Sequence, residues 1–160
     1  MMSNLAQEIG DLLRRQGLTL GVVESATGGL ISHLITNVPG SSDYYLGSVT
    51  AYSNEVKIRV VGVGGETIGE YGAVSPQVAE EMAQGGRELL AVDICLADTG
   101  IAGPGGALPD KPVGLFYIGL ADKEGAYSRR FQFTGNREEI KLSAACAVLD
   151  WLREYCTRFE

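Results

Sequence analysis

The residue whose type and position most favour chemistry is Ser25. An apolar run over residues 18–23 ends in the polar segment Glu24-Ser25-Ala26-Thr27-Gly28-Gly29, and apolar residues at helical spacing follow. This pattern predicts a strand, a tight turn and a helix. Backbone N–H groups at the start of a helix stabilise negative charge, so the turn suits a nucleophilic serine or an anionic ligand group. The alternative is that Ser25 and Thr27 only cap the helix.

A nucleophilic serine needs a neighbouring base, because its hydroxyl hardly ionises near neutral pH. The only histidine, His33, lies within the helix that follows Ser25, which disfavours a Ser-His-Asp triad. Lys57 and Tyr52 are then the candidate bases, because both come at or just after the end of a second predicted strand. The ends of such strands meet at one edge of an open sheet, where Ser25 is also expected.

A lysine acts as a base only where burial or a nearby cation lowers its pKa. The alternative for Lys57 is an ordinary solvated lysine on a helix. Ser53 lies four residues before Lys57, so the two side chains could meet on one helical turn. Ser53 is therefore a weaker candidate for a nucleophile or a proton relay.

A glycine-rich segment follows a third apolar run and reads Thr99-Gly100-Ile101-Ala102-Gly103-Pro104-Gly105-Gly106. Glycines let the backbone approach a ligand closely and direct N–H groups at phosphate. The segment is neither a P-loop nor a G-x-G-x-x-G motif, so a structural turn is the alternative. Its position after a strand, beside two other polar turns, favours ligand binding.

Three charged residues accompany these segments. Arg137 is expected in the first turn of the last helix, where a positive charge opposes the helix dipole and pairing with a phosphate would explain it. Glu24 could orient a base or a ligand, and Asp98 could orient a ligand hydroxyl. A solvated arginine and two loop carboxylates are the alternatives.

The composition is that of a globular domain. The chain has 160 residues, of which 45% are hydrophobic and 21% charged, so a single domain over residues 1–160 is expected. A net charge of −7 argues against general nucleic-acid binding but allows a small anionic ligand. Without a signal peptide or a long apolar run we expect a cytoplasmic protein that does not associate with membranes. Three cysteines without C-x-x-C spacing predict buried thiols and no metal site.

Hydrophobic periodicity and turn residues predict an alternation of helices and strands. Gly17 is expected to end the first helix, Ser75 and Pro76 to start a middle helix, and Asn136 with Glu139 to form a capping box. Residues 62–74 are expected to be irregular, and Asn54 to cap a short helix. The predicted helices span 4–16, 28–37, 54–61, 75–90 and the C-terminal segment; the predicted strands span 18–23, 44–53, 93–98, 113–121 and 127–133.

Because helices alternate with the first three strands and a hairpin follows, the chain is expected to form an α/β fold. The predicted architecture is a three-layer α/β/α sandwich whose sheet is mostly parallel with one antiparallel strand.

Taken together, five segments resemble the CinA C-terminal domain family, the family of nicotinamide-mononucleotide deamidases, in order and spacing over nearly the whole chain. They are Glu24–Gly29, Ala51–Lys57, Gly72–Ser75, Thr99–Gly106 and Lys111-Pro112-Val113-Gly114. The resemblance implies a mixed five-stranded sheet. It also implies hydrolysis of the carboxamide of nicotinamide mononucleotide to the acid, with release of ammonia, in pyridine nucleotide recycling and without a cofactor or metal.

The resemblance also assigns roles to residues. Ser25 matches the family's nucleophile, and Tyr52 and Lys57 match the groups that assist it. Thr99 and the glycine-rich loop match substrate contacts, and Arg137 matches an arginine that contacts the phosphate. The substrate-binding set expected in this chain is Glu24, Thr27, Gly28, Gly29, Thr99, Gly100, Ala102, Gly103, Pro104, Gly105, Gly106 and Arg137.

Two positions depart from the family pattern. Ala26 stands where cysteine is usual, and Asp98 stands where an apolar residue is more usual. A charge at Asp98 could raise the pKa of Lys57 or change the ligand preference. The family's larger members carry a further N-terminal domain, and we expect this chain to be a stand-alone form that assembles as a homo-oligomer.

The leading hypothesis is therefore a serine amidohydrolase acting on a small nucleotide. Ser25 would attack the amide, Lys57 aided by Tyr52 would take the proton, and N–H groups of the Thr27–Gly29 turn would stabilise the oxyanion. The alternative is a non-catalytic module of the same fold that binds or senses a nucleotide. A metal-dependent phosphohydrolase is disfavoured because no carboxylate cluster has suitable spacing.

Overall fold

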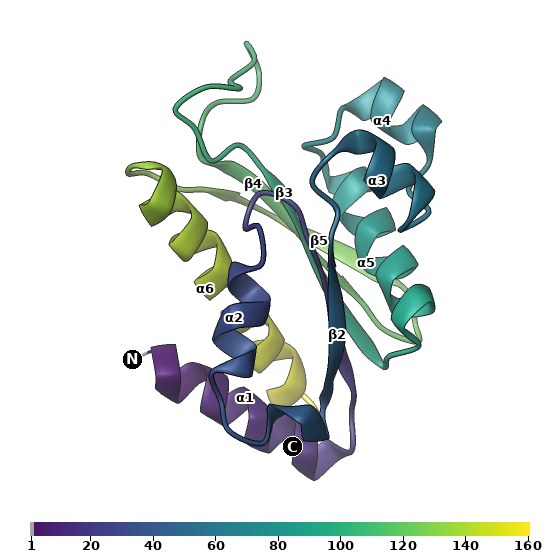
Figure 1. Ribbon diagram of the computed structural model, residues 1–160, viewed down its shortest axis with the longest axis vertical. Helices are drawn as coiled ribbons and strands as arrows, with labels where there is room; N and C mark the ends of the chain where they lie inside the picture. The colour runs from purple at the N-terminus through teal and green to yellow at the C-terminus, as the bar shows by residue number, and fades with distance from the viewer. Residues whose placement is uncertain (1) are drawn as a thin grey trace.

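A five-stranded sheet separates two layers of helices in the computed structural model, which describes residues 2–160 (Figure 1). The strands are β1 (Leu20–Glu24), β2 (Tyr45–Thr50), β3 (Ile94–Gly100), β4 (Leu115–Ala121) and β5 (Ala126–Gln132). The helices are α1 (Met2–Gln16), α2 (Leu30–Thr36), α3 (Asn54–Arg59), α4 (Gly65–Tyr71), α5 (Pro76–Leu90) and α6 (Arg137–Thr157), with a 3₁₀ turn, η1, at Ser41–Asp43.

The strand order is β2-β1-β3-β4-β5. β1 pairs in parallel with β2 and β3, whereas β4 is antiparallel to β3 and β5. Four strands thus run one way and β4 runs the other, which confirms the predicted mixed, mostly parallel sheet. Because β1, β2 and β3 are parallel, the segments that follow them leave the same edge of the sheet.

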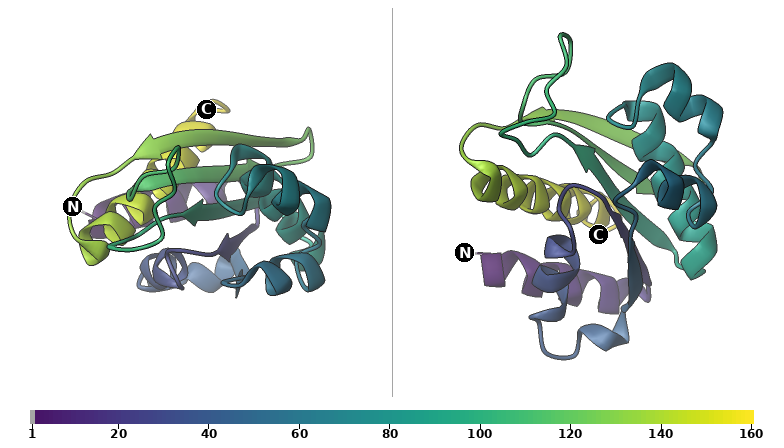
Figure 2. Two further views of the ribbon diagram at one scale, coloured as in Figure 1. Left: turned by 90° about the horizontal axis from the view of Figure 1, so that it is seen from above. Right: turned by 45° about the horizontal axis from the view of Figure 1, so that its top comes forward.

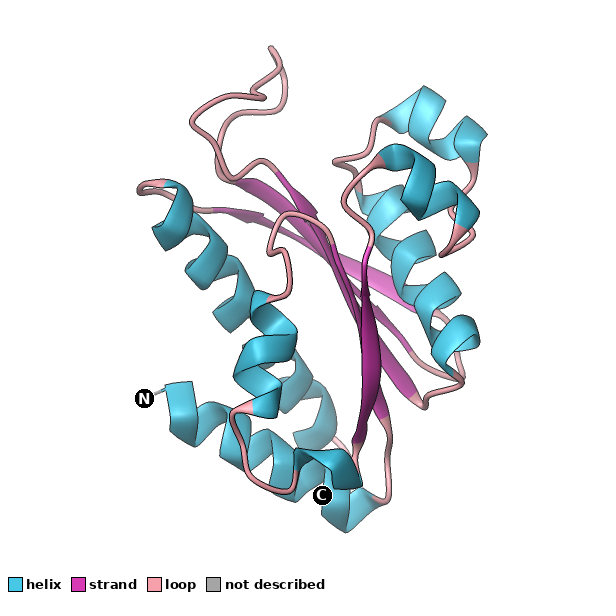
Figure 3. Ribbon diagram, in the orientation of Figure 1, coloured by secondary structure: helices cyan, strands magenta, loops and turns pink. Residues whose placement is uncertain are grey.

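Each face of the sheet has its own helical layer (Figure 3). Helices α1, α2 and α6 cover one face and α3, α4 and α5 cover the other, which confirms the three-layer sandwich. Every residue of β1 is buried, as expected for a central parallel strand with helices on both sides. Val22 belongs to the core beneath α1, α2 and α6, and its neighbour Val23 belongs to the core beneath α5.

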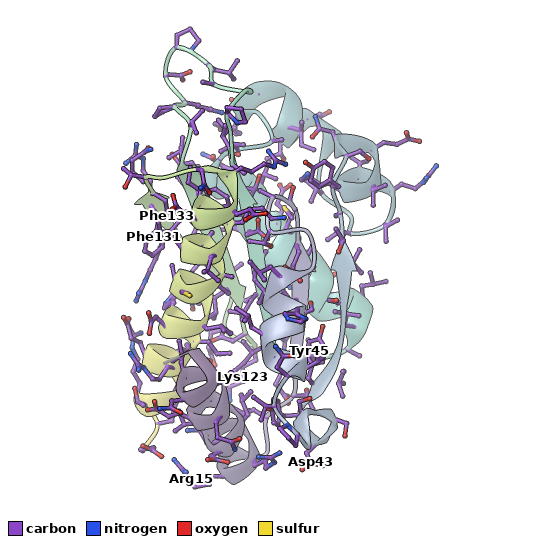
Figure 4. All side chains as sticks on the ribbon, turned by 60° about the vertical axis from the view of Figure 1, so that its left-hand side comes forward. Arg15, Asp43, Tyr45, Lys123, Phe131 and Phe133 are labelled. Carbon is purple, nitrogen blue, oxygen red and sulfur yellow. The ribbon has the colours of Figure 1, made fainter. Side chains whose placement is uncertain are left out.

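A small third core fixes the start of α6. Phe116 and Ile140 are buried there, and the rings of Phe131 and Phe133 stack with centroids 5.5 Å apart. Figure 4 labels these two phenylalanines, one near the end of β5 and one just after it, beside the N-terminal half of α6. The first turn of α6 is thereby held next to the carboxyl edge of β1 and β3.

The predicted helix ends are confirmed where local chemistry sets them. Gly17 follows α1 with φ of +65°, and its N–H donates to the carbonyl of Arg14. The Ser75 hydroxyl accepts from the N–H of Val78 at the start of α5. Before α6, the Asn136 side chain and the Glu139 side chain form the predicted capping box.

Four local predictions are wrong or incomplete. Residues 65–71 form α4 within the segment expected to be irregular, and η1 was not predicted. The cap of α3 is Ser53, not Asn54, since the Ser53 hydroxyl accepts from the N–H of Val56 at 3.1 Å. β3 extends to Gly100, so Thr99 and Gly100 lie in the strand rather than in the loop after it.

The loop between β3 and β4 extends past the carboxyl edge of the sheet, at the same end of the molecule as α3 and α4 (Figure 2). Lys111 ties this loop to α4 by donating from Nζ to the carbonyl of Tyr71 at 2.6 Å. The glycine-rich segment, the turn after β1 and the start of α3 therefore surround one end of the sheet.

Candidate active site

A cavity of about 280 Å³ opens at this end of the sheet, and we call it the Ser25 cavity. Its walls come from the segments after β1 and β2, the segment before α5, the end of β3 with its following loop, and the start of α6. The lining residues are Ser25, Ala26, Tyr52, Asn54, Lys57, Ala73, Val74, Thr99, Gly100, Ile101, Ala102, Gly106 and Arg137.

Ser25 sits in the turn after β1 and is 7% exposed. Its N–H donates to Oδ2 of Asp98 at 3.1 Å, which anchors the turn to β3. Within residues 2–160 the Ser25 hydroxyl makes no hydrogen bond, and no side chain of residues 25–29 caps α2. Instead, the Glu24 carboxylate accepts from the N–H groups of Ile31 and Ser32 at 2.8 and 3.0 Å. The capping alternative for Ser25 is thus contradicted, and its hydroxyl is available to a ligand.

Among the described residues that line this cavity, Lys57 is the one buried cation. Only 2% of it is exposed, because α3 turns it inward beneath the end of β2. Its Nζ donates to the carbonyl of Tyr52 at 3.0 Å. Burial lowers the pKa of Lys57, and the nearby Asp98 carboxyl opposes that change, which is one of the two effects considered for its charge. The alternative of a solvated helix lysine is therefore contradicted.

Tyr52 and Arg137 close the outer side of the cavity. The Tyr52 side chain is exposed, and its hydroxyl accepts from Nη2 of Arg137 at 3.2 Å. Nη1 of Arg137 donates to the carbonyl of Gly103 at 2.7 Å. The guanidinium thus links the segment after β2 to the glycine-rich loop. These contacts offset the unfavourable position of a positive charge in the first turn of a helix.

The end of β3 forms the floor. The Thr99 hydroxyl donates to the carbonyl of Ala73 at 2.7 Å, which joins β3 to the segment before α5. A Cβ on Gly100 would lie 2.3 Å from the Phe116 ring, so only glycine fits there. Ala102 and Gly106 line the cavity, whereas Gly103, Pro104 and Gly105 do not.

Besides these three loop residues, the structure places four more predicted ligand contacts outside this cavity. Glu24 and Thr27 are fully buried behind Ser25. Gly28 and Gly29 line a second cavity of about 540 Å³ between α2 and α6, which we call the α2–α6 cavity. Its other lining residues are Thr27, Leu30, His33, Glu138, Lys141 and Leu142.

Of the turn expected to stabilise an oxyanion, Thr27–Gly29, two N–H groups are already bonded, and Gly29 lines the α2–α6 cavity. The N–H of Thr27 donates to Oδ1 of Asp98 at 3.1 Å, and the N–H of Gly28 donates to the carbonyl of Ser25. Both amides are therefore already used. Ala26, directly after Ser25, lines the cavity, and its N–H has no hydrogen-bond partner in the part of the chain that the structure describes.

Sequence reasoning missed five lining residues as individual contacts: Ala26, Asn54, Ala73, Val74 and Ile101. For Asn54 the signal was misread, since Ser53 caps α3 and leaves Asn54 beside the cavity. Ala73 and Val74 belong to a segment that carried the family resemblance, but neither has a chemically active side chain. The weaker nucleophile candidate Ser53 is already used by its cap.

The sequence model of the CinA C-terminal domain matches residues 2–156. The chain belongs to the CinA C-terminal domain family. It is 48% identical to a CinA-like protein of Syntrophomonas wolfei over 94% of this chain and 36% of that protein. The chain thus spans about a third of the length of the curated relatives it matches.

Solved structures of CinA proteins share the whole fold. The competence damage-inducible protein A of Klebsiella pneumoniae superimposes with a TM-score of 0.96 at 28% identity, covering 99% of both chains. The competence/damage inducible protein CihA of Agrobacterium tumefaciens gives a TM-score of 0.90 at 36% identity, covering 94% of this chain and 93% of that one. The mixed α/β sandwich of this CinA domain is therefore shared across the family.

Three further observations bear on other expectations. Across residues 2–160, no helix is both long and apolar enough to cross a membrane. Over the same described range, no group of three or more His, Cys, Asp and Glu side chains is arranged to hold a metal ion. Cys95 and Cys156 are buried, and burial raises the pKa of their thiols to about 12 and about 11.

Proposed function

We propose that this CinA domain hydrolyses the carboxamide of nicotinamide mononucleotide to nicotinate mononucleotide and ammonia. The observation that carries the proposal is that the unbonded hydroxyl of Ser25 and the buried amine of Lys57 line the same cavity. Because burial lowers the pKa of Lys57, a larger fraction of its amine is neutral at a given pH. The neutral amine can act as a base. The family resemblance supplies the identity of the amide.

In the first half of the reaction Ser25 Oγ attacks the carboxamide carbon while Lys57 Nζ takes the hydroxyl proton. The negative charge on the carbonyl oxygen needs donors in a site that excludes water. The free N–H of Ala26 is suited to this role, because the amide directly after a nucleophile is placed beside the oxygen it creates. Collapse of the intermediate breaks the C–N bond, and the proton on Lys57 passes to the leaving nitrogen, which departs as ammonia.

In the second half a water molecule resolves the acyl-enzyme. Lys57, again neutral, takes a proton from water as its oxygen attacks the acyl carbon. The C–O bond to Ser25 then breaks, and the proton on Lys57 returns to Ser25 Oγ. Protons balance over the cycle, and the products are the carboxylic acid and ammonia.

The outer wall suits the phosphate end of the nucleotide. The Arg137 guanidinium is a planar donor group at the cavity mouth, and such groups bind phosphate in a two-pronged manner. The backbone of Ala102 and Gly106 lines the same side. Tyr52 orients Arg137 through its hydroxyl and holds the Lys57 amine through its carbonyl. One residue thus contacts the group proposed to bind the phosphate and the group proposed to act on the amide.

The test is ammonia release from nicotinamide mononucleotide by the purified protein, with a chelator present. We expect Ser25→Ala to lower turnover by about 10³-fold or more while leaving the fold intact. Ser48→Ala, an exposed serine on β2, is the matched control and should match the wild type.

Thermal stabilisation by the nucleotide separates catalysis from binding. If the protein is an amidohydrolase, the substrate should raise the unfolding temperature of Ser25→Ala, and this variant should release no ammonia. If the wild type is stabilised but also releases none, the protein is a nucleotide-binding module instead. Near-normal turnover by Ser25→Ala would contradict the mechanism.

A further inference from the structure

Two carboxyl groups lie fully buried behind Ser25, and the mechanism above uses neither. They belong to Glu24 on β1 and Asp98 on β3, and both are 0% exposed. A single hydroxyl lies between them: Thr27 Oγ1 is 2.7 Å from Oε1 of Glu24 and 2.5 Å from Oδ2 of Asp98. Two buried negative charges this close would be costly, so the protonation of this cluster has to be explained.

Glu24 has the environment of an ionised carboxylate. Besides Thr27, it accepts from the N–H groups of Ile31 and Ser32 and from the Ser32 hydroxyl at 2.6 Å. All four contacts are donors, and three come from the first turn of α2, where the helix dipole favours negative charge. Glu24 is therefore the member of the pair that carries the charge.

Asp98 has the environment of a neutral acid. Its Oδ2 accepts from the N–H of Ser25 and its Oδ1 from the N–H of Thr27, both at 3.1 Å. Burial, helped by the Glu24 charge, raises the pKa of Asp98 to about 6, while the Thr27 hydroxyl and the two amide hydrogen bonds work in the other direction. One hydroxyl has only one proton. When Thr27 gives that proton to Glu24, Asp98 loses this bond to its ionised form and its pKa rises further.

We propose that Asp98 is held as a neutral carboxylic acid at neutral pH, with its proton donated to the Thr27 hydroxyl, which in turn donates to the Glu24 carboxylate. Asp98 is then a positioning residue for the proposed reaction. It fixes the turn that carries Ser25 through two amide hydrogen bonds, and it does so without placing a negative charge beside Lys57. This inference rests on the proposed function for its catalytic consequence, but not for the protonation of Asp98.

The consequence concerns Lys57. An ionised Asp98 raises the pKa of Lys57 and thereby removes the neutral amine on which a base depends. A protonated Asp98 leaves the effect of burial unopposed. Asp98 thus combines a strong anchor with an uncharged state, which an alanine could not supply.

The other charged groups around Asp98 are accounted for element by element. From β1 the facing charge is Glu24, and from α3 it is Lys57. On β4 the residue paired with Asp98 is the apolar Ile118. On α6 Arg137 is bonded to Tyr52 and Gly103, and Lys141 ends beside Gly28. Glu24 is therefore the anion, and Lys57 the cation, that act on Asp98.

The direct test is nuclear magnetic resonance of the whole protein labelled with ¹³C at the aspartate carboxyl carbon. At pH 7 we expect one aspartate signal at the position of a carboxylic acid, and Asp98→Asn should remove it. A spectrum in which every aspartate is a carboxylate overturns the proposal, and this reading needs only the wild type should the variant fail to fold. It is also independent of activity, so it stands or falls separately from the proposed amidohydrolase.

The catalytic consequence is tested by the pH dependence of kcat/KM for nicotinamide mononucleotide. In Asp98→Asn the amide N–H₂ replaces the acid proton but cannot accept from Ser25, so we expect about a tenfold loss of rate with the midpoint of the acid limb unchanged. If wild-type Asp98 is ionised, removing its charge shifts that midpoint to lower pH by about 1 unit or more, which overturns the proposal. Asp93→Asn, directly before the start of β3, is the matched control and should follow the wild type.

Discussion

The turn of residues 25–29 separates two cavities that differ in how much chemistry they can support. The α2–α6 cavity is about 540 Å³ and the Ser25 cavity about 280 Å³. The larger one lies between two helices and is lined largely by solvent-facing side chains, including His33, Glu138 and Lys141. The smaller one gathers side chains from five segments at the end of the sheet. The candidate site is therefore the smaller cavity, and it is identified by its lining residues rather than by its volume.

The two lysines make the difference concrete. Lys141 lines the α2–α6 cavity from the surface of α6 and is partly exposed. Lys57 is 2% exposed, and within residues 2–160 the one hydrogen bond of its amine is to the carbonyl of Tyr52. Removing a cation from water disfavours its charged form, so the same side chain is a solvated charge in one cavity and a candidate base in the other.

The largest expected effect on kcat/KM comes from replacing Lys57 by methionine, an apolar side chain of similar length. The same replacement at Lys141 is the control. Lys57→Met should lower kcat/KM by about 10³-fold, because it removes the proposed base. It should also raise the unfolding temperature, because it removes a buried amine with little compensation. Lys141→Met should leave kcat/KM unchanged. Equal losses in the two variants, measured by ammonia release and thermal unfolding, would erase the distinction between the cavities.

Neighbouring charges at the start of α6 sharpen the comparison further, because Arg137 faces the Ser25 cavity and Glu138 the α2–α6 cavity. Arg137→Met should raise KM for nicotinamide mononucleotide by about 10- to 100-fold with a smaller effect on kcat, as expected for a lost charge-assisted hydrogen bond. Glu138→Gln should not. The measurement is repeated with nicotinamide riboside, which lacks the phosphate. An equal loss for both substrates would argue against a phosphate contact.

The buried carboxyl behind the Ser25 cavity has an expected signature in stability. Since the pKa of Asp98 is raised in the fold from 3.8 to about 6, folding favours its protonated form. That contribution is complete below about pH 4 and falls by about 3 kcal/mol as the pH rises from about 4 to about 6, where the unfolded chain is ionised at this position and the folded chain is not. Asp98→Asn should remove this slope from a plot of unfolding free energy against pH. An unchanged slope in the variant would assign the pH dependence to other groups.

The smallest effects are expected from glycines at the two cavities. Gly100→Ala brings a Cβ to 2.3 Å from the Phe116 ring and should lower stability by about 1–3 kcal/mol. Gly28 has φ of +60°, and its Cβ would meet only the end of Lys141 at 3.6 Å. Gly28→Ala should therefore cost about 1 kcal/mol of backbone strain and leave kcat unchanged. Thermal unfolding measures both losses of stability. A lowered kcat in Gly28→Ala would show that the α2–α6 cavity also contributes to the reaction.

Much of the fold was predictable because its signals are local. Gly17, Ser75 and the Asn136–Glu139 pair act on backbone groups within a few residues, so their effects can be read from sequence alone. The helix α4 was missed because Gly64, Gly65 and Gly69 lower the helical signal of its segment. It forms nonetheless where the Glu81 carboxylate of α5 accepts from the N–H of Gly64 and from the Thr67 hydroxyl, two contacts that periodicity does not reveal.

The candidate site was predictable in its membership but not in its electrostatics. Parallel strands deliver Ser25, Lys57 and Thr99 to one edge, and this follows from the order of elements alone. Which amides remain free does not follow, because the amides of Ser25 and Thr27 are bonded by a carboxylate more than 70 positions away in the chain. Glu24 was expected to contact a ligand, but its carboxylate is buried and accepts from Thr27 and from the first turn of α2.

By itself the sequence determined the alternation of helices and strands, the helix caps and the three polar segments that meet at one sheet edge. Those features depend on hydrophobic period and on side chains that act over a few residues. Only the tertiary structure decided that Lys57 is buried, that Glu24 and Asp98 share the Thr27 hydroxyl, and that Arg137 reaches Tyr52. Charge states and free donors depend on desolvation and on partners from distant segments, and packing sets both.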